Sequence, residues 1–165
     1  MTADHIVHRI DEGRTAVGDG FWLLHADGAS LGNPGHGGAG AVIYDDQGRV
    51  AAEIAQPLGP AVTNNEAEYQ ALLLGLNSLK ALGARKIRIR LDSELAVRQV
   101  KGDYQVKSPR LAGLFRQVMD LLAGFEVYDI AHVRRELNRA ADALASRAAA
   151  ASGRPPVGGL DPADG

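Results

Sequence analysis

Four acidic side chains share one position in the predicted secondary structure, because each stands where a strand ends or a helix begins. In chain order they are Asp27, Glu68, Asp92 and Asp142. Residues at the carboxyl ends of neighbouring parallel strands meet in one site, and clustered carboxylates need cations between them to stay ionised. The 165 residues include no cysteine, so oxygen ligation favours Mg²⁺ or Mn²⁺ over zinc. Two such ions about 3.5–4 Å apart support in-line attack on a phosphodiester.

Each acid alone also has a structural interpretation. Glu68 can form a salt bridge with a nearby arginine, and Asp27 begins a turn-like Asp-Gly-Ala-Ser sequence. Asp92 precedes a serine that can cap a helix, and strand alternation puts it on one face with two arginines. Asp142 is favoured near a helix N-terminus by the helix dipole. Only the combination of the four acids indicates a metal site.

The element that positions Glu68 is a predicted helix from Thr63 to about Gly83. Thr63 and Glu66 have the spacing of a capping box, which fixes the start of the helix. Glu68 lies on an inward-facing stripe, and Glu66 lies about 200° around the helix from it. The other members of the stripe are Leu72, Gly75, Leu76 and Leu79. We therefore interpret Glu66 as a cap and Glu68 as an inward carboxylate that needs a partner.

The remaining elements alternate between strands and helices around this one. The predicted strands cover residues 21–26, 39–44, 50–58, 86–91 and 125–132. Further helices are predicted at 94–100, 108–123 and 138–151, the last capped by Asn138. Short turns join the first three strands into an antiparallel meander, whereas helical crossovers make the later two strands parallel to the first. The expected fold class is α/β with a mixed sheet.

Residues 21–151 are expected to form one domain, between a loosely held extension at 1–20 and a flexible tail at 152–165. No apolar run resembles a membrane helix or signal peptide, so we expect a cytoplasmic protein. The net charge of −2 conceals an asymmetry, since residues 1–79 carry 3 basic and 10 acidic side chains and residues 80–139 carry 13 and 7. This split is consistent with binding a polyanion through metal ions, and equally with solvated surfaces.

Four motifs around the acids resemble those of type 1 ribonuclease H, in the bacterial and archaeal branch without an extended basic handle. They read Asp27-Gly-Ala-Ser-Leu-Gly-Asn-Pro-Gly, Thr63-Asn-Asn-Glu-Ala-Glu, Leu91-Asp-Ser and Arg135-Glu-Leu-Asn-Arg-Ala-Ala-Asp-Ala-Leu-Ala. The resemblance covers about residues 21–150 and extends to the N-terminal domain of bifunctional ribonuclease H/phosphatase proteins. It implies a ribonuclease H-like fold, whose five-stranded mixed sheet has three antiparallel and two parallel strands and is flanked by helices on both faces.

The same resemblance implies an endoribonuclease that hydrolyses the RNA strand of RNA–DNA hybrids and leaves 5′-phosphate and 3′-hydroxyl ends. Separately, we expect the protein to be a monomer. The resemblance assigns two Mg²⁺ ions, with Mn²⁺ as a substitute, to the four acids. Residues near the acids are implied to bind substrate, namely Ser30, Asn33, Asn64, Asn65, Ser93 and Asn138. The first three asparagines look like residues that sense RNA 2′-hydroxyls in the minor groove. Helix capping is the alternative for Asn64 and Asn65.

Two features depart from the family pattern. Arg135 stands seven residues before Asp142, where many relatives place a mobile histidine. It is expected to assist the leaving phosphate or product release, or alternatively to contact backbone phosphates. His36 and His132 are interpreted as structural.

The second departure is the missing basic handle, for which only Lys101, Lys107 and Arg110 lie in the matching region. Weak hybrid binding, or a substrate range that includes double-stranded RNA, would follow from this loss. Two other functions stay open, a non-catalytic binding module and a different nuclease on the same fold. Retention of all four acids argues against the first.

Overall fold

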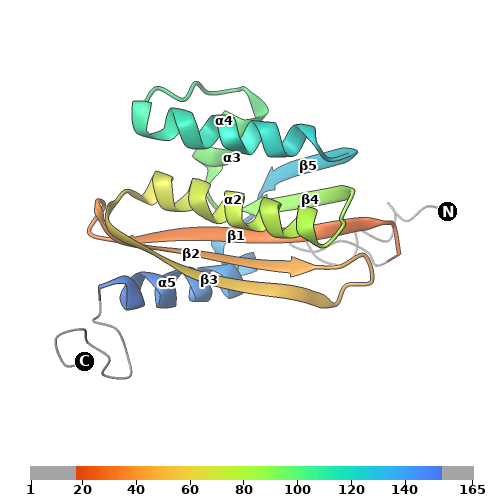
Figure 1. Ribbon diagram of the computed structural model, residues 1–165, viewed down its shortest axis with the longest axis horizontal. Helices are drawn as coiled ribbons and strands as arrows, with labels where there is room; N and C mark the ends of the chain where they lie inside the picture. Colours follow the sequence, from red (N-terminus) through yellow and green to blue (C-terminus); the bar gives the residue numbers. More distant parts are fainter. Residues whose placement is uncertain (1–17, 154–165) are drawn as a thin grey trace.

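The computed structural model describes residues 18–153, which form one mixed sheet with helices on both faces (Figure 1). The strands are β1 (Phe21–Leu31), β2 (Gly35–Tyr44), β3 (Val50–Val62), β4 (Lys86–Leu91) and β5 (Val127–His132). The helices are α2 (Asn64–Ala81), α3 (Glu94–Lys101), α4 (Pro109–Ala123) and α5 (Arg139–Ser152), with a 3₁₀ turn, η1 (Arg135–Leu137), before α5. The predicted five-stranded mixed sheet is confirmed.

The strand order is β3-β2-β1-β4-β5, so β1 occupies the centre of the sheet. It pairs antiparallel with β2 on one side and parallel with β4 on the other, and β5 continues the parallel half. The last parallel pair joins Ala26 to Leu91. Asp27 and Asp92 follow this pair directly, so the sheet delivers two of the four acids to the same edge.

Helices α2 and α5 cover opposite faces of the sheet, and α4 packs on the outer side of α2 (Figure 1). Helix α5 lies very close to β2 because two residues of that strand have no side chain. A Cβ atom at Gly38 would lie 2.2 Å from the Ala149 nitrogen, and one at Gly40 would lie 2.3 Å from the Ala141 carbonyl oxygen. The alanines of α5 therefore pack against the backbone of the strand.

The apolar stripe predicted for α2 forms the centre of the core. Leu72, Leu76 and Leu79 are fully buried there, together with Ile87 and Ile89 of β4. Full burial of such a side chain contributes about 1.5–3 kcal/mol. The stripe holds α2 against the sheet, and the orientation of Glu68 on that helix follows from it.

Three strands are longer than the sequence predicted. Strand β2 begins at Gly35 instead of Ala39, because its ladder with β1 reaches back to His36. Strand β1 continues past Asp27 to Leu31, because its antiparallel ladder with β2 extends beyond the end of the parallel ladder with β4. Strand β3 continues past Gly59 to Val62, so the expectation that Gly-Pro ends it is wrong. Gly59 and Ala61 take positive φ values of 87° and 60°, and pairing with β2 resumes at Val62. Asp27 therefore ends only the parallel part of β1.

The first described residues before β1 contact the sheet. The Asp19 carboxylate lies 2.6 Å from Arg88 Nη1, and both side chains are largely buried. Most of the predicted extension (1–17) and most of the predicted tail (154–165) lie outside the described residues. Within residues 18–153 no helix has both the length and the apolar character that a membrane crossing requires.

Candidate active site

The first two acids are brought together by the close contact between β1 and α2. The Gly28 amide donates a hydrogen bond to Glu68 Oε1 at 2.8 Å and lies 3.0 Å from Asp27 Oδ1. A Cβ atom at position 28 would lie 2.2 Å from the Ala67 carbonyl carbon, so only glycine permits this approach. Asp27 and Glu68 are only 5% and 7% exposed. A buried pair of carboxylates results.

The third and fourth acids come from the other two elements of the site. One carboxylate oxygen from each of Asp27, Glu68 and Asp92 lies within 4.8 Å of the other two. Asp142 lies in the first turn of α5, where its amide donates to the Asn138 carbonyl oxygen. It lines the same cavity as the other three acids. The structure thus gathers all four predicted acids in one place.

The electrostatics of this cluster favour a bound cation. Burial raises the pKa of Asp27 well above its ordinary value, and Glu68, Asp92 and Asp142 raise it further. Burial also raises the pKa of Glu68, although hydrogen bonds from Asp27 and Gly28 oppose this rise. Glu68 Oε2 is buried and has no hydrogen-bond partner among the described residues. A buried carboxylate oxygen without a donor is costly, and a cation would satisfy it.

The acids line an open cavity of about 410 Å³. Four of the six residues predicted to bind substrate also line it, namely Ser30, Asn64, Asn65 and Ser93. The Ser93 hydroxyl additionally caps α3 by accepting from the Ala96 amide at 3.2 Å. Asn64 and Asn65 are exposed at the start of α2, whose cap is Thr63.

The other two predicted substrate residues lie differently. Asn33 is exposed beside the cavity, and its Oδ1 accepts from the Asn64 amide at 2.9 Å. Asn138 is fully buried, and its side-chain amide donates to the Ala26 carbonyl oxygen at 3.0 Å. The expected side-chain cap by Asn138 is absent from the start of α5. The Asn138 side chain instead connects the start of α5 to Ala26, the residue before Asp27, because β1 passes directly beside Asn138.

Arg135 lies on the rim of the cavity, with Nη2 3.5 Å from Asp142 Oδ1 and the side chain 77% exposed. His36 and His132 are exposed at strand ends and do not line the cavity. Arg88 pairs with Asp19, and Arg90 pairs with Asp129, instead of with Asp92. The Asp92 carboxylate can therefore take part in the acidic cluster.

Sequence reasoning missed two residues around the site and the contact that a third residue, Arg110, makes. Gly28 sets the distance between the first two acids, and its only signal was its place after Asp27. Ser146 lines the cavity one helical turn after Asp142, so the spacing of four residues would have identified it. Arg110 pairs with Glu66 at 2.9 Å, a contact between distant elements that no periodicity predicts.

Comparison with known proteins agrees with this geometry. A family model described as "Reverse transcriptase-like" matches residues 25–148. The bifunctional protein Rv2228c of Mycobacterium tuberculosis is 40% identical over 142 residues, which are 86% of this chain and 39% of that protein. Ribonuclease HI of Halobacterium salinarum is 40% identical over 127 residues, covering 76% of this chain and 63% of that protein. The chain therefore spans less than two thirds of the length of these curated relatives.

Solved structures give the same result. The N-terminal RNase H domain of Rv2228c superposes with a TM-score of 0.77 at 41% identity, over 80% of this chain and 95% of that domain. LC11-RNase H1, solved in complex with an RNA/DNA hybrid, superposes with a TM-score of 0.74 at 34% identity, over 79% and 98% of the two chains. The strand order and the acids at the end of the parallel ladder define a ribonuclease H-like fold. The chain belongs to the type 1 ribonuclease H family.

Proposed function

We propose that the protein is an endoribonuclease that hydrolyses the RNA strand of RNA–DNA hybrids, leaving 5′-phosphate and 3′-hydroxyl ends. The observation that carries this proposal is the acidic cluster with its unpartnered buried oxygen, Glu68 Oε2. The relative solved with an RNA/DNA hybrid supports the choice of substrate. A binding module without catalysis would have no use for carboxylates held together at a cost in stability.

The donor set of the site suits hard divalent cations. Asp27, Glu68, Asp92 and Asp142 offer only carboxylate oxygens, the ligands that Mg²⁺ and Mn²⁺ prefer. We infer that these four side chains hold two Mg²⁺ ions, for which Mn²⁺ can substitute. Bound cations supply Lewis acidity and lower the pKa of water at the reacting phosphodiester.

The chain's own residues bind and orient the substrate around that cluster. We assign recognition of RNA 2′-hydroxyls to Asn33, Asn64 and Asn65, which lie at or beside the cavity. An A-like duplex displays these hydroxyls in a wide, shallow minor groove, and a DNA duplex lacks them. Ser30 and Ser93 add hydroxyl groups to the cavity wall. Selectivity for RNA would thus be decided next to the acids.

The test of this function is a comparison of initial cleavage rates on one sequence prepared as hybrid, DNA duplex, RNA duplex, and single strands, each with and without Mg²⁺. The proposal predicts rapid magnesium-dependent cleavage of the hybrid. Slower cleavage of the RNA duplex would extend the substrate range, as the missing handle suggests. Preferred cleavage of DNA would instead indicate a different nuclease, and binding of the hybrid without any cleavage would indicate a binding module.

Arg135 is expected to act on the departing group. Its guanidinium lies on the rim, 3.5 Å from Asp142, where it can stabilise negative charge that develops on the scissile phosphate and on the leaving 3′-oxygen. Arg135→Ala should therefore lower kcat by about tenfold to a hundredfold and change KM little. Steady-state kinetics on the hybrid will measure both constants. An unchanged kcat with a large rise in KM would assign Arg135 to binding backbone phosphates.

Hybrid affinity should depend only weakly on salt. Six arginines of the basic segment between residues 80 and 139 are already paired with acids of this chain, namely Arg85, Arg88, Arg90, Arg98, Arg110 and Arg135. Each protein–phosphate contact adds about 0.7–0.9 to the slope of log affinity against log salt, and we expect about two to four contacts.

The slope can be measured by titrating the hybrid across a salt series in Mg²⁺, with Asp27→Asn protein to prevent turnover. A slope equivalent to about eight or more contacts would reveal a more extensive basic binding surface than two to four phosphate contacts. Equal affinity for hybrid and DNA duplex would remove the assigned role of the three asparagines.

A further inference from the structure

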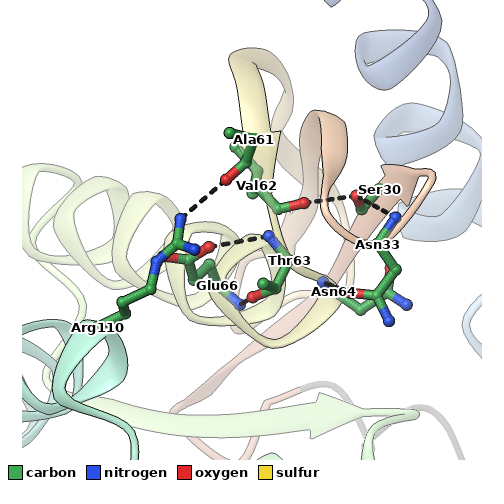
Figure 2. A network of polar contacts seen from close by, with 8 residues as sticks. All are labelled: Ser30, Asn33, Ala61, Val62, Thr63, Asn64, Glu66 and Arg110. Carbon is green, nitrogen blue, oxygen red and sulfur yellow. Dashed lines mark hydrogen bonds and ion pairs between the residues drawn. The ribbon is translucent and has the colours of Figure 1, made fainter.

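The junction between β3 and α2, residues 61–64, lies where the β2–β3 ladder is irregular, and side chains bond to its backbone (Figure 2). In each of the four residues one backbone group bonds to a side chain. These bonds join the Ala61 carbonyl to Arg110 (2.8 Å), the Val62 carbonyl to Ser30 (2.5 Å), the Thr63 amide to Glu66 (2.8 Å), and the Asn64 amide to Asn33 (2.9 Å). The path of this junction is therefore determined by its partners.

Arg110 is the partner that comes from the most distant element. It lies in the first turn of α4 and reaches across to α2, where its Nε is 2.9 Å from Glu66 Oε2 while its Nη2 donates to the Ala61 carbonyl. The same Glu66 carboxylate accepts from the Thr63 amide through Oε1. One guanidinium thus fixes the junction twice, directly at Ala61 and through Glu66 at Thr63.

Local backbone stability explains neither the position of Arg110 in α4 nor the conformation of Ala61. A cation in the first turn of a helix opposes the helix dipole, and the first turn of α4 contains no acid. Ala61 has a φ of 60°, a left-handed conformation that is unfavourable for a residue with a Cβ atom and persists only where its surroundings fix it. The bond from Arg110 to the Ala61 carbonyl is one such restraint.

The junction leads directly into the residues assigned to RNA recognition. Asn64 is the last residue of the junction and Asn65 follows it. Both line the cavity beside Glu68, and the Asn64 amide donates to Asn33. A shift of the junction would therefore move these amide groups relative to the substrate. The buried stripe of α2 would still hold Glu68, so the acids would stay in place.

We propose that Arg110 is a positioning residue for substrate selectivity: it fixes the junction so that Asn33, Asn64 and Asn65 meet the 2′-hydroxyls of the RNA strand. This inference rests on the proposed function. From the sequence, Arg110 was one of three basic residues in the region of the missing handle. In the structure its guanidinium bonds to Glu66 and Ala61, although the side chain is partly exposed.

The test compares Arg110→Ala with Arg116→Ala, which removes the same charge from an exposed position of the same helix. Both are made in Asp27→Asn protein, and affinities for hybrid and for DNA duplex are measured across a salt series. Arg110→Ala should lower the hybrid-to-DNA affinity ratio by about threefold to tenfold without changing the salt slope. Equal losses for both duplexes, with a slope smaller by about 0.7–0.9, would overturn the proposal in favour of a phosphate contact.

A second readout needs no substrate. Amide hydrogen exchange at Thr63 and Asn64 should be faster in Arg110→Ala than in wild type and unchanged in Arg116→Ala. Adding Glu66→Gln to Arg110→Ala should change the affinity ratio no further, because both act on the same junction. Unchanged exchange at the two amides would overturn the positioning role. A wild-type protein without any preference for hybrids would instead overturn the proposed function, and the exchange data would still decide whether Arg110 fixes the junction.

Discussion

Glu68→Gln is expected to abolish magnesium-dependent cleavage of a hybrid while leaving the fold intact. The substitution removes one negative charge from the acidic cluster and replaces a proposed carboxylate ligand, whose Oε2 has no partner among the described residues, by a neutral amide. Residues that merely orient metal ligands cost about 10–100-fold when replaced, so loss of a ligand should cost more than about a hundredfold. Single-turnover cleavage with saturating protein will measure the loss without a contribution from weak binding.

The fold should tolerate this substitution. Burial and neighbouring acids disfavour the charged form of Glu68, so a neutral amide should keep or raise the melting temperature measured without metal. Glu126→Gln is the matched control, because Glu126 is exposed and pairs with Arg85 just before the start of β4, at the opposite end of that strand from Asp92. Glu66→Gln tests the helix face, since Gln still completes the capping box and should keep most of kcat. An essential Glu66 with a dispensable Glu68 would contradict the assignment of the two faces.

Gly28→Ala is expected to damage both the fold and the site. The new methyl group would lie 2.2 Å from the Ala67 carbonyl carbon and 2.3 Å from the Glu68 nitrogen, so α2 would have to move away from β1. That movement would break the bond from the Gly28 amide to Glu68 and separate the first two acids. Overpacking of this kind costs about 1–3 kcal/mol. Cleavage should fall by more than about a hundredfold, as for loss of the ligand itself.

Gly113→Ala is the matched control for that substitution. Gly113 lies inside α4, and a Cβ atom there would meet nothing within 4 Å. Alanine in a helix interior is favoured over glycine by about 0.5–1 kcal/mol, so the control should raise the melting temperature and leave activity unchanged. Chemical denaturation and Mg²⁺ titration of both variants will measure stability and metal affinity. Wild-type metal affinity in Gly28→Ala would show that the β1–α2 distance does not set the site.

The sequence was sufficient to predict the type and order of the main helices and strands and the gathering of the four acids, because periodicity and capping are local signals. The capping box of Thr63 and Glu66 fixed the start of α2, and the stripe that includes Leu72 placed Glu68 inwards, as the structure confirms. The order of strands and crossovers then brought Asp27 and Asp92 to the same edge of the sheet.

Features that depend on pairing between distant segments could not be predicted in this way. The extension of β1 past Asp27 depends on its ladder with β2, which a single strand pattern does not reveal. Asn138 is buried against β1, where its side chain donates to the Ala26 carbonyl oxygen, 112 residues away in the chain. The contact of Arg110 with Glu66 likewise joins two helices whose separate sequences give no sign of it.

The most direct test of the central claim is a time course on an RNA–DNA hybrid whose two strands carry different fluorescent labels. Products are sized at single-nucleotide resolution, and their ends are identified by phosphatase and kinase treatment. The proposed function predicts internal cleavage of the RNA strand alone, dependent on Mg²⁺, with 5′-phosphate and 3′-hydroxyl ends and an intact DNA strand. Cleavage of the DNA strand, or cleavage that persists in excess chelator, would contradict it.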